Sequence, residues 1–589
     1  MKNAEIAKLF DRTADVMAVL GVNSFKILAY RKIVRTLEEL PQDIEVLAAS
    51  KELENVPGIG ESSAEKIREY LRTGHISEFE EVWKEIPAGV MDIMKIPSVG
   101  PKTAALLWQE GGITSVAELK AKLDAPNLAG LSKIPTLGEK KLQKIKQNLA
   151  FLSTSSGRVR LGEAMPIALE LVEFLRKVPG VQAAQYCGSL RRGKETIGDI
   201  DIAVAAEEKH AKAIGKAVTK HAQCAEVIAE GDTKTSIRTI GGMQVDVRVV
   251  PAESYGAAVQ YFTGSKEHNV KLRELAIKKG YKLNEWGLFK GDKQVAGRTE
   301  AEIYETLGLA CLPPEMREDR GEIDLAAEMW ARKPGVPPTW ETLELTDLRG
   351  DLHMHTVASD GTKSIDEMVA ECKRRGYIYC AITDHSKSQF QANGLKSDRL
   401  LEHIEAIHAV AKQAKGILVL AGSEVDILAD GSLDYEDELL AKLDWVIASP
   451  HAALSQESDP ATTRLVKAMS NPYVCVIGHP TGRLVPSRKG LEPDMQKVVF
   501  AAARNGVALE LNANTMRLDL RDTHLRMARD AGVKVCINTD AHSFQDMDQM
   551  IFGVITARRG WLLKEHVLNT LPVEGFRKWM KNRKEAAGW

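Results

Sequence analysis

Seven apolar runs in residues 346–589 constrain the fold most, because six of them end in or beside a residue that can bind a metal. The runs end near residues 353, 384, 424, 450, 478, 511 and 540, with helical patterns between them. Alternating strands and helices predict a barrel-like α/β domain whose site lies at the carboxyl ends of the strands. Nine metal-type residues stand at these ends: His353, His355, Asp360, His385, Glu424, His451, His479, Asp540 and His542. Nine are too many for packing alone, so we predict a multinuclear hydrolytic site.

The ligand types limit the chemistry of this site. The His353-x-His355 pair offers two imidazoles to a single ion, and the carboxylate of Glu424 can bridge two ions. Sites built from imidazole and carboxylate accept Mn²⁺, Zn²⁺ or Fe²⁺, and the softness of the metal does not decide among the three.

A second constellation lies upstream. The turn Gly188-Ser189-Leu190-Arg191-Arg192-Gly193 precedes Asp199 and Asp201 in an apolar strand, and Asp246 is centred in another apolar strand. Acids at i and i+2 share one face of a strand, where they repel one another unless cations lie between them. If the two strands are neighbours, the three carboxylates hold two Mg²⁺ or Mn²⁺ ions for in-line phosphoryl transfer. The turn supplies backbone N–H groups, a hydroxyl and a guanidinium for phosphates.

A short pattern recurs three times in the first 150 residues, as Pro57-Gly-Ile-Gly60, Pro97-Ser-Val-Gly100 and Pro135-Thr-Leu-Gly138. The near-constant spacing marks an internal repeat. Each copy predicts a helix, a tight hairpin and a second helix whose free N–H groups can bind a phosphate. The unit resembles the helix-hairpin-helix motif, which implies that the copies hold a sugar-phosphate backbone without reading its sequence. Ser98 and Thr136 replace Gly58 of the first copy, so we expect the second and third hairpins to approach phosphate less closely.

Composition excludes several protein classes. Lysine and arginine number 79 and aspartate and glutamate 81, so the chain has no overall basic excess. The seven cysteines contain no C-x-x-C pair, no apolar run has the length of a membrane helix, and the charged start does not resemble a signal peptide. Residues 332–338 hold three prolines and a glycine and predict an extended tether. We therefore predict a cytosolic, multidomain protein.

The upstream constellation resembles the X family of DNA polymerases. The resemblance rests on Cys187–Val204 and on Tyr261-Phe262-Thr263-Gly264-Ser265 with Asn269 and Arg273, and it covers roughly residues 1–315. It implies that Asp199 and Asp201 bind both metals and that Asp246 is a third ligand that activates the primer 3′-hydroxyl. It also implies a set of nucleotide-binding residues: Gly188, Ser189 and Arg192 at the phosphates, Tyr261, Phe262 and Gly264 at the sugar, Asn269 at the base edge and Arg273 at the template.

The N-terminal segment resembles the small lyase domain of that family. Residues 25–32 match its DNA-holding helix, and Lys66 falls at the position of its Schiff-base lysine, which implies a 5′-deoxyribose-phosphate lyase. Ser62 replaces a supporting lysine of the family, and the alternative is that Lys66 only binds phosphate. The implied DNA-binding residues are Lys26, Gly58, Gly60, Lys66, Gly100, Lys102, Gly138 and Lys140.

The C-terminal domain resembles the polymerase and histidinol phosphatase (PHP) family, with all nine ligand positions present. The resemblance implies up to three ions. They would be held by His353, His355, Glu424 and Asp540, by Glu424, His451 and His479, and by Asp360, His385 and His542. A polymerase core joined to such a domain is the arrangement of bacterial and archaeal X-family polymerases.

These features together predict a multidomain α/β protein. We expect helix-hairpin-helix domains at residues 1–85 and 86–152, an α+β nucleotidyltransferase palm at 153–255, a thumb at 256–318, a linker at 319–345 and a distorted (β/α)7 barrel at 346–589. The expected function is a gap-filling DNA repair polymerase with a metal-dependent 3′-5′ exonuclease or other end-processing phosphoesterase.

The expected partners are gapped or nicked DNA and deoxynucleoside triphosphates, with a monomer as the default state. Two alternatives stay open. The PHP domain could act on a small phosphoester, or the protein could be a non-catalytic repair scaffold in which metals only stabilise the structure.

Overall fold

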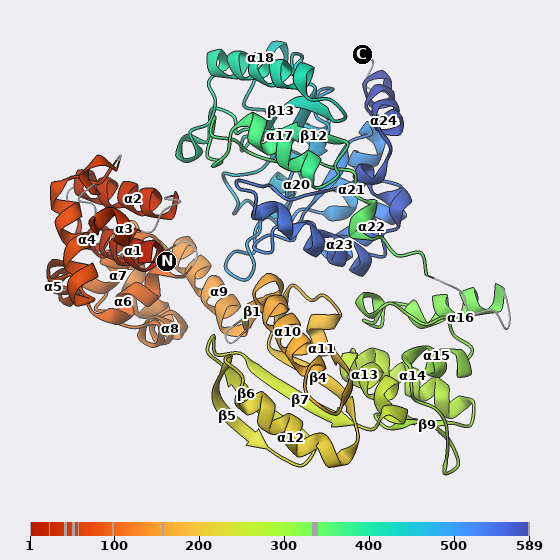
Figure 1. Cartoon of the computed structure of the whole chain (residues 1–589). Helices are drawn as coiled ribbons and strands as arrows, with labels where there is room; N and C mark the ends of the chain where they lie inside the picture. The colour runs from red at the N-terminus through yellow and green to blue at the C-terminus, as the bar shows by residue number, and fades with distance from the viewer. Residues whose placement is uncertain are drawn as a thin grey trace. The chain divides into compact units, whose positions relative to one another are not determined.

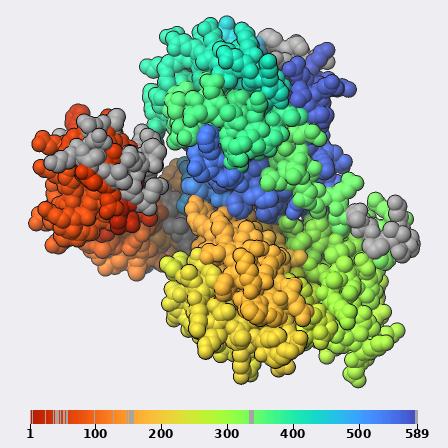
Figure 2. Space-filling model, viewed as in Figure 1, coloured from red at the N-terminus to blue at the C-terminus, as the bar shows by residue number. Residues whose placement is uncertain are grey.

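The structure is a computed structural model, and it describes residues 2–22, 24–39, 44–49, 53–56, 58–96, 99–155, 158–332 and 340–586. The chain forms two compact units, Met1–Ser156 and Gly157–Trp589 (Figures 1 and 2). Most of the predicted proline tether falls in residues 333–339, outside the described residues. Among the helices that are described, none is long and apolar enough to cross a membrane.

The first unit contains only helices and turns among its described residues. One of its two apolar cores surrounds Phe10 and Phe79, whose rings meet edge to face with centroids 4.9 Å apart, and the other surrounds Leu107 and Leu142. The helices are α1 (Lys2–Leu20), α2 (Ser24–Glu39), α3 (Ile44–Ala49), α4 (Glu61–Thr73), α5 (Ser77–Lys84), α6 (Ala88–Met94), α7 (Pro101–Gln109), α8 (Val116–Asp124) and α9 (Glu139–Ser155).

Each of the three repeats leads into a helix that begins directly after a glycine. Helices α4, α7 and α9 follow Gly60, Gly100 and Gly138. Gly60 and Gly100 are N-caps and have no side chain to bond the first N–H groups. A Cβ added at any of these three glycines would meet nothing within 4 Å. The helix starts are therefore open to an anion such as phosphate.

The third hairpin keeps the backbone path of the first despite its different sequence. Gly58 has φ +99° and Thr136 has φ +68°, so both lie in the left-handed region that favours glycine. Pro57, Pro97 and Ser98 lie outside the described residues.

The second unit begins with a five-stranded sheet in the order β2-β4-β7-β6-β5, which we call the palm sheet. Strands β4 and β7 are parallel neighbours, and the other pairs are antiparallel. Alternating Ile and Val residues of β4 and β7 pack against two helices, α10 and α12. The elements are β1 (Val159–Arg160), α10 (Leu161–Arg176), β2 (Val181–Tyr186), α11 (Gly188–Arg191), β3 (Thr196–Ile197), β4 (Asp199–Ala206), α12 (Glu208–Thr219), β5 (Cys224–Glu230), β6 (Lys234–Thr239) and β7 (Gln244–Val250).

A smaller antiparallel sheet, β10-β9-β8, and four helices follow and form the thumb. The elements are α13 (Tyr255–Thr263), α14 (Lys266–Lys278), β8 (Lys282–Asn284), β9 (Gly287–Lys290), β10 (Lys293–Ala296), α15 (Glu300–Thr306) and α16 (Glu322–Arg332). Helix α16 occupies part of the segment predicted as a linker, because Ala326 joins the thumb core and Glu322 bonds the buried ring of His268 at 2.7 Å.

The remaining residues form the predicted barrel. Its seven strands run parallel in chain order, β11 (Gly350–Asp351), β12 (Tyr379–Ile382), β13 (Leu418–Asp426), β14 (Trp445–Ser449), β15 (Val476–Ile477), β16 (Ala508–Asn512) and β17 (Val535–Asn538). A bridge between Met354 and Ala541 joins the first edge to the last, so the sheet is nearly closed. The fold class predicted from the alternating pattern is confirmed.

Helices cover the outside of this barrel (Figure 1). They are α17 (Ile365–Arg374), α18 (Ser397–Gln413), α19 (Asp437–Leu440), α20 (Ser458–Met469), α21 (Met495–Asn505), α22 (Asp522–Asp530), α23 (Met550–Arg559) and α24 (Val573–Ala586). The barrel also packs directly on the palm, because Leu518, Phe552 and Ile555 belong to the same apolar cluster as the palm sheet. Leu518 is fully buried there.

Candidate active sites

The palm sheet brings the three predicted carboxylates together. Asp201 of β4 and Asp246 of β7 are directly paired in the register of the two parallel strands, and Asp199 lies two residues before Asp201 on the same face. Lys234 of β6 makes an ion pair of 2.8 Å with Asp246. The sheet therefore assembles an acidic cluster in which Lys234 is paired with Asp246.

The charges of these carboxylates are strongly coupled. Burial, followed by the neighbouring charges of Asp199 and Asp246, raises the pKa of Asp201 to about 6. Burial acts in the same direction on Asp246, but its bonds with Lys234 and Ser236 prevail and lower its pKa. Cations placed between the carboxylates would relieve the repulsion, so the donor set fits divalent metal ions.

The Gly-Ser-x-Arg-Arg turn lies against this cluster. Gly188 begins α11 with φ +64°, and a Cβ there would come within 2.7 Å of the Asp201 carboxylate. Only glycine allows this approach, which places the turn's backbone beside the candidate metal ligands. Ser189 follows and is half-buried. The second arginine, Arg192, donates from Nε to Glu318 at 3.0 Å and from Nη1 to the carbonyl of Thr263.

The aromatic pair predicted for the sugar lies at the end of α13. The rings of Tyr261 and Phe262 are perpendicular with centroids 5.4 Å apart, and the guanidinium of Arg248 lies over Phe262. Gly264 caps the helix with φ +70°.

The two polar residues predicted for the bases lie on α14. The buried amide of Asn269 accepts from Gln260 and donates to the carbonyl of Tyr261, both at 2.7 Å. Arg273, one turn later, is exposed and donates to the carbonyl of Asn269 at 3.3 Å. Asn269 thus fixes α14 to the aromatic pair, while Arg273 faces solvent.

In the first unit, Lys66 lies on α4 and its side chain is only 12% exposed. Its Nζ is 2.8 Å from Glu78 and donates to the Ser62 hydroxyl at 2.9 Å. Glu78 also pairs with Lys26. The Ser62 that replaces a family lysine is therefore a direct partner of Lys66, and a substrate of Lys66 would have to displace Glu78. Lys102 and Lys140 are exposed in the first turns of α7 and α9.

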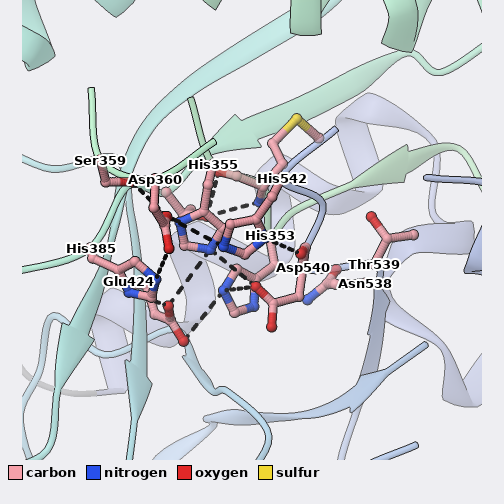
Figure 3. Close-up of polar contacts among 12 residues, drawn as sticks. His353, His355, Ser359, Asp360, His385, Glu424, Asn538, Thr539, Asp540 and His542 are labelled. Carbon is pink, nitrogen blue, oxygen red and sulfur yellow. Dashed lines mark hydrogen bonds and ion pairs between the residues drawn. The ribbon is translucent and has the colours of Figure 1, made fainter. Parts of the chain in front are cut away.

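The nine residues predicted as PHP ligands meet at the carboxyl ends of the barrel strands. Figure 3 labels His353, His355, Asp360, His385, Glu424, Asp540 and His542 among them. Three groups of side chains place their ligand atoms within 4.8 Å of one another. They are His353, His355, Glu424 and Asp540, then His355, Asp360, His385 and His542, and then His385, Glu424 and His451. His479 joins them through a 2.8 Å contact between its Nε2 and Glu424. His355 and His385 thus each belong to two of the three groups. The sequence prediction placed each of them in one group only.

The electrostatics of the barrel cluster favour ionised carboxylates. Burial opposes the ionisation of Glu424, but the histidines around it, His451 and His353 foremost, hold its pKa well below its ordinary range. Burial and the neighbouring His542 and His385 lower the pKa of His355 to about 4. His355 is therefore neutral at physiological pH, which is the form that binds metals.

Several buried atoms in the cluster lack a hydrogen-bond partner. They include Nε2 of His353, Nδ1 of His355 and Nδ1 of His479, and all three residues are fully buried. Buried polar atoms are normally satisfied, so atoms of this kind indicate a ligand that the protein residues alone do not replace. The donor set, rich in imidazole and carboxylate, fits transition metal ions.

A layer of buried acids orients these histidines. Glu510 of β16 accepts from His353 Nδ1 at 2.7 Å and from the backbone N–H of His479, and Asp426 contacts His451 Nδ1 at 2.6 Å. Such partners fix the tautomer and orientation of a metal-binding imidazole. The sequence interpretation missed both, although an acid inside the apolar run Ala508–Asn512 was an available signal.

Arg483 does not reach the cluster. Its position four residues after His479 in the sequence is compatible with a phosphate contact or with a place at the surface, but its side chain is 5% exposed and makes a 2.6 Å ion pair with Glu195 of the palm. The surface interpretation is therefore wrong, because the barrel packs against the palm at this point.

Comparison with known proteins identifies the domains of the chain. Family models match at four places: a helix-hairpin-helix domain at residues 1–76, a SAM-like helix-hairpin-helix tandem at 90–150, a DNA polymerase beta thumb at 258–318 and a PHP domain at 351–514. The DNA polymerase/3′-5′ exonuclease PolX of Bacillus subtilis (strain 168) is 36% identical over 585 residues, which cover 99% of this chain and 100% of that protein. The chain belongs to the PolX family.

Two more distant relatives match parts of this PolX-family chain. DNA polymerase lambda of Arabidopsis thaliana is 26% identical over 349 residues, which cover 54% of this chain and 62% of that protein. A probable phosphatase of Thermoanaerobacter sp. (strain X514) is 28% identical over 249 residues, which cover 40% of this chain and 96% of that protein. The resemblance predicted from the sequence motifs, an X-family polymerase with a PHP domain, is confirmed by the PolX match and by the thumb and PHP family models.

Proposed function

We propose that this PolX-family protein is a DNA repair enzyme that extends a primer across a short gap at the palm and hydrolyses DNA ends at the barrel. The observation that carries the proposal is that one chain assembles two separate sets of ligands, a carboxylate triad beside a phosphate-binding turn and an imidazole-carboxylate cluster. The name of the full-length relative, DNA polymerase/3′-5′ exonuclease, pairs the same two activities.

At the palm, Asp199, Asp201 and Asp246 would hold two divalent cations, Mg²⁺ or Mn²⁺. When bound, these ions supply charge neutralisation for the triphosphate and acidify the primer 3′-hydroxyl. Asp246 is the candidate acceptor of the hydroxyl proton. The backbone N–H groups of the turn and the guanidinium of Arg192 would bind the phosphates and align the reacting phosphorus.

The other nucleotide contacts follow from the thumb. Tyr261, Phe262 and Gly264 would shape the sugar pocket, Asn269 would face the base edge and Arg273 the template strand. The open helix starts after Gly60, Gly100 and Gly138 would bind backbone phosphates, with Lys26, Lys102 and Lys140 adding positive charge.

At the barrel, His353, His355, Asp360, His385, Glu424, His451, His479, Asp540 and His542 would hold up to three ions, of which Mn²⁺, Zn²⁺ and Fe²⁺ suit the donors. When bound, these ions supply the Lewis acidity that phosphoester hydrolysis requires. Glu510 and Asp426 hold His353 and His451 in their orientations. A small phosphoester is the second candidate substrate, because one relative is named a probable phosphatase.

The test is a denaturing gel of a labelled primer on a one-nucleotide gap with Mn²⁺. We expect extension by one residue when deoxynucleotides are present and shortening from the 3′ end when they are absent. A small phosphomonoester in excess should not slow the shortening. Extension without shortening would reject the exonuclease, and full competition by the phosphomonoester would favour the second candidate.

Lys66 is a candidate lyase nucleophile, because its side chain is only 12% exposed and lies on the helix that follows the first hairpin. We expect borohydride to trap the wild-type protein on a 5′-deoxyribose-phosphate end, and the Lys66→Ala variant to show no trapping. Lys95→Ala, which removes an exposed lysine of the same unit, is the matched control. Equal trapping of both variants would assign Lys66 to phosphate binding alone.

A further inference from the structure

The nucleotide-binding turn of the palm rests on the barrel, at three contacts outside either ligand cluster. Arg559, the last residue of α23, donates to the backbone carbonyl of Arg192. A Cβ at the next residue, Gly193, would come within 2.1 Å of the Ile555 side chain. Arg483 holds Glu195 by an ion pair of 2.6 Å. The barrel thus supports the backbone of the turn directly.

The same arginine reaches the side chain of Arg192 through Glu318. The carboxylate of Glu318, at the end of the thumb, lies 3.0 Å from Arg192 Nε, 3.0 Å from Arg559 Nη1 and 3.3 Å from Lys194 Nζ. The Glu318 side chain is 9% exposed and that of Arg559 2% exposed. Burial opposes the charge of Glu318, but Arg559 and Arg192 lower its pKa to about 2, so the carboxylate is ionised at physiological pH.

Arg559 is itself fixed within the barrel. Its Nη2 makes a 2.6 Å ion pair with Asp522 of α22, and Asp522 also pairs with Arg320 at 3.1 Å. A planar guanidinium can bond several acceptors at once, and here it bonds Asp522, Glu318 and the Arg192 carbonyl. Glu318 and the Thr263 carbonyl then orient the Arg192 guanidinium from two sides.

From this chain of contacts we infer that Arg559, a residue of the PHP barrel, is a positioning residue for nucleotide binding at the polymerase site. It fixes Glu318 and the backbone of the turn, and through them it sets the direction in which Arg192 presents its guanidinium to a triphosphate. The inference rests on the role proposed for Arg192. It gives the barrel a part in synthesis that is independent of its own hydrolysis.

The test compares full-length variants in single-nucleotide gap filling. Arg559→Met keeps a long side chain and removes the donors, so we expect the KM for the deoxynucleotide to rise about tenfold, as for a lost charged hydrogen bond, with a smaller change in kcat. Hydrolysis of the primer 3′ end without nucleotides should stay within about twofold, since Arg559 lies outside the barrel's ligand cluster. Arg559→Lys should recover part of the loss, and Arg504→Met, an exposed arginine of α21, should match wild type.

Three outcomes would overturn the inference. The first is an unchanged KM in Arg559→Met while Arg192→Ala raises it. The second is an equal loss of extension and hydrolysis, which would indicate only a structural role. If neither Arg192→Ala nor Arg559→Met raises the KM, the role proposed for Arg192 fails as well.

If the Arg559→Met variant does not fold, the Glu318→Gln variant provides an independent test of the inference. Positioning requires the KM to rise in this variant, because the amide cannot bond all three donors. A fall in KM would also overturn the inference, since it would mean that Glu318 sequesters Arg192 from the nucleotide.

Discussion

In the Asp201→Asn variant we expect the rate of primer extension to fall by about 10³-fold or more. The substitution removes a negative charge that would hold both cations, and these cations supply several kcal/mol of transition-state stabilisation. Hydrolysis of the 3′ end at the barrel should be unchanged. The measurement is the labelled-primer gel on a one-nucleotide gap, read with and without deoxynucleotides. Asp232→Asn, which neutralises an exposed acid of the same domain, is the control.

Loss of both activities in Asp201→Asn would contradict two separate sites, and a stability measurement excludes misfolding as the cause. In metal-free protein the raised pKa of Asp201 means that its ionisation opposes folding. The stability it contributes is complete below the ordinary value of 3.8 and is lost as the pH rises towards about 6. Asn has no such charge, so above pH 6 the variant should unfold at a higher temperature than wild type, and the difference should vanish at low pH.

The Glu424→Gln variant should have the opposite phenotype. Glu424 is fully buried and belongs to two of the three ligand groups, so its amide would lose a negative charge needed by more than one ion. We expect 3′-end hydrolysis to fall by about 10³-fold or more while gap filling is retained. Initial rates of primer shortening with Mn²⁺, and of extension with Mg²⁺, measure the two effects.

Glu371→Gln is the matched control, since Glu371 is an 8% exposed glutamate of α17 whose partners are Arg374 and Arg375 rather than the cluster. It should keep both activities. If hydrolysis of the 3′ end persists in Glu424→Gln, the nuclease site lies outside the barrel cluster. Bound metal, measured by mass spectrometry of the purified variants, should fall in Glu424→Gln and not in Glu371→Gln.

Much of this architecture could be predicted from sequence because its signals are local or periodic. The acids at 199 and 201 mark one face of a strand, and seven apolar runs, six of which end in or beside a metal-type residue, define the carboxyl edge of a barrel. The pairing of Asp201 with Asp246 could only be stated conditionally, because it depends on which strands are neighbours. The grouping of His385 with both Asp360 and Glu424 arises from the loop paths after β11 and β12, which no spacing encodes.

The contacts between domains could not be predicted at all. Glu318 and Arg559 are ordinary charged residues in their own segments, and their partners lie 126 and 367 residues away along the chain. Their role depends on burial, because an ion pair exposed to water contributes little, whereas the loss of one partner of a buried pair is costly. Arg483 shows the same limit. Its position close to His479 in the sequence favours a place beside the metal ligands, whereas its side chain pairs with Glu195 of the palm.

The shared core of palm and barrel bears on how such a chain can be divided. Leu518, Phe552 and Ile555 lie in the cluster that the palm strands form, so part of the palm's interior is encoded more than 250 residues downstream of its sheet. A gene fragment that ends before the barrel would leave that interior open to water. In this protein the polymerase and phosphoesterase domains therefore have separate active sites but share part of one apolar core. Recombination that exchanged one of the two domains would have to preserve the surface that contacts the other.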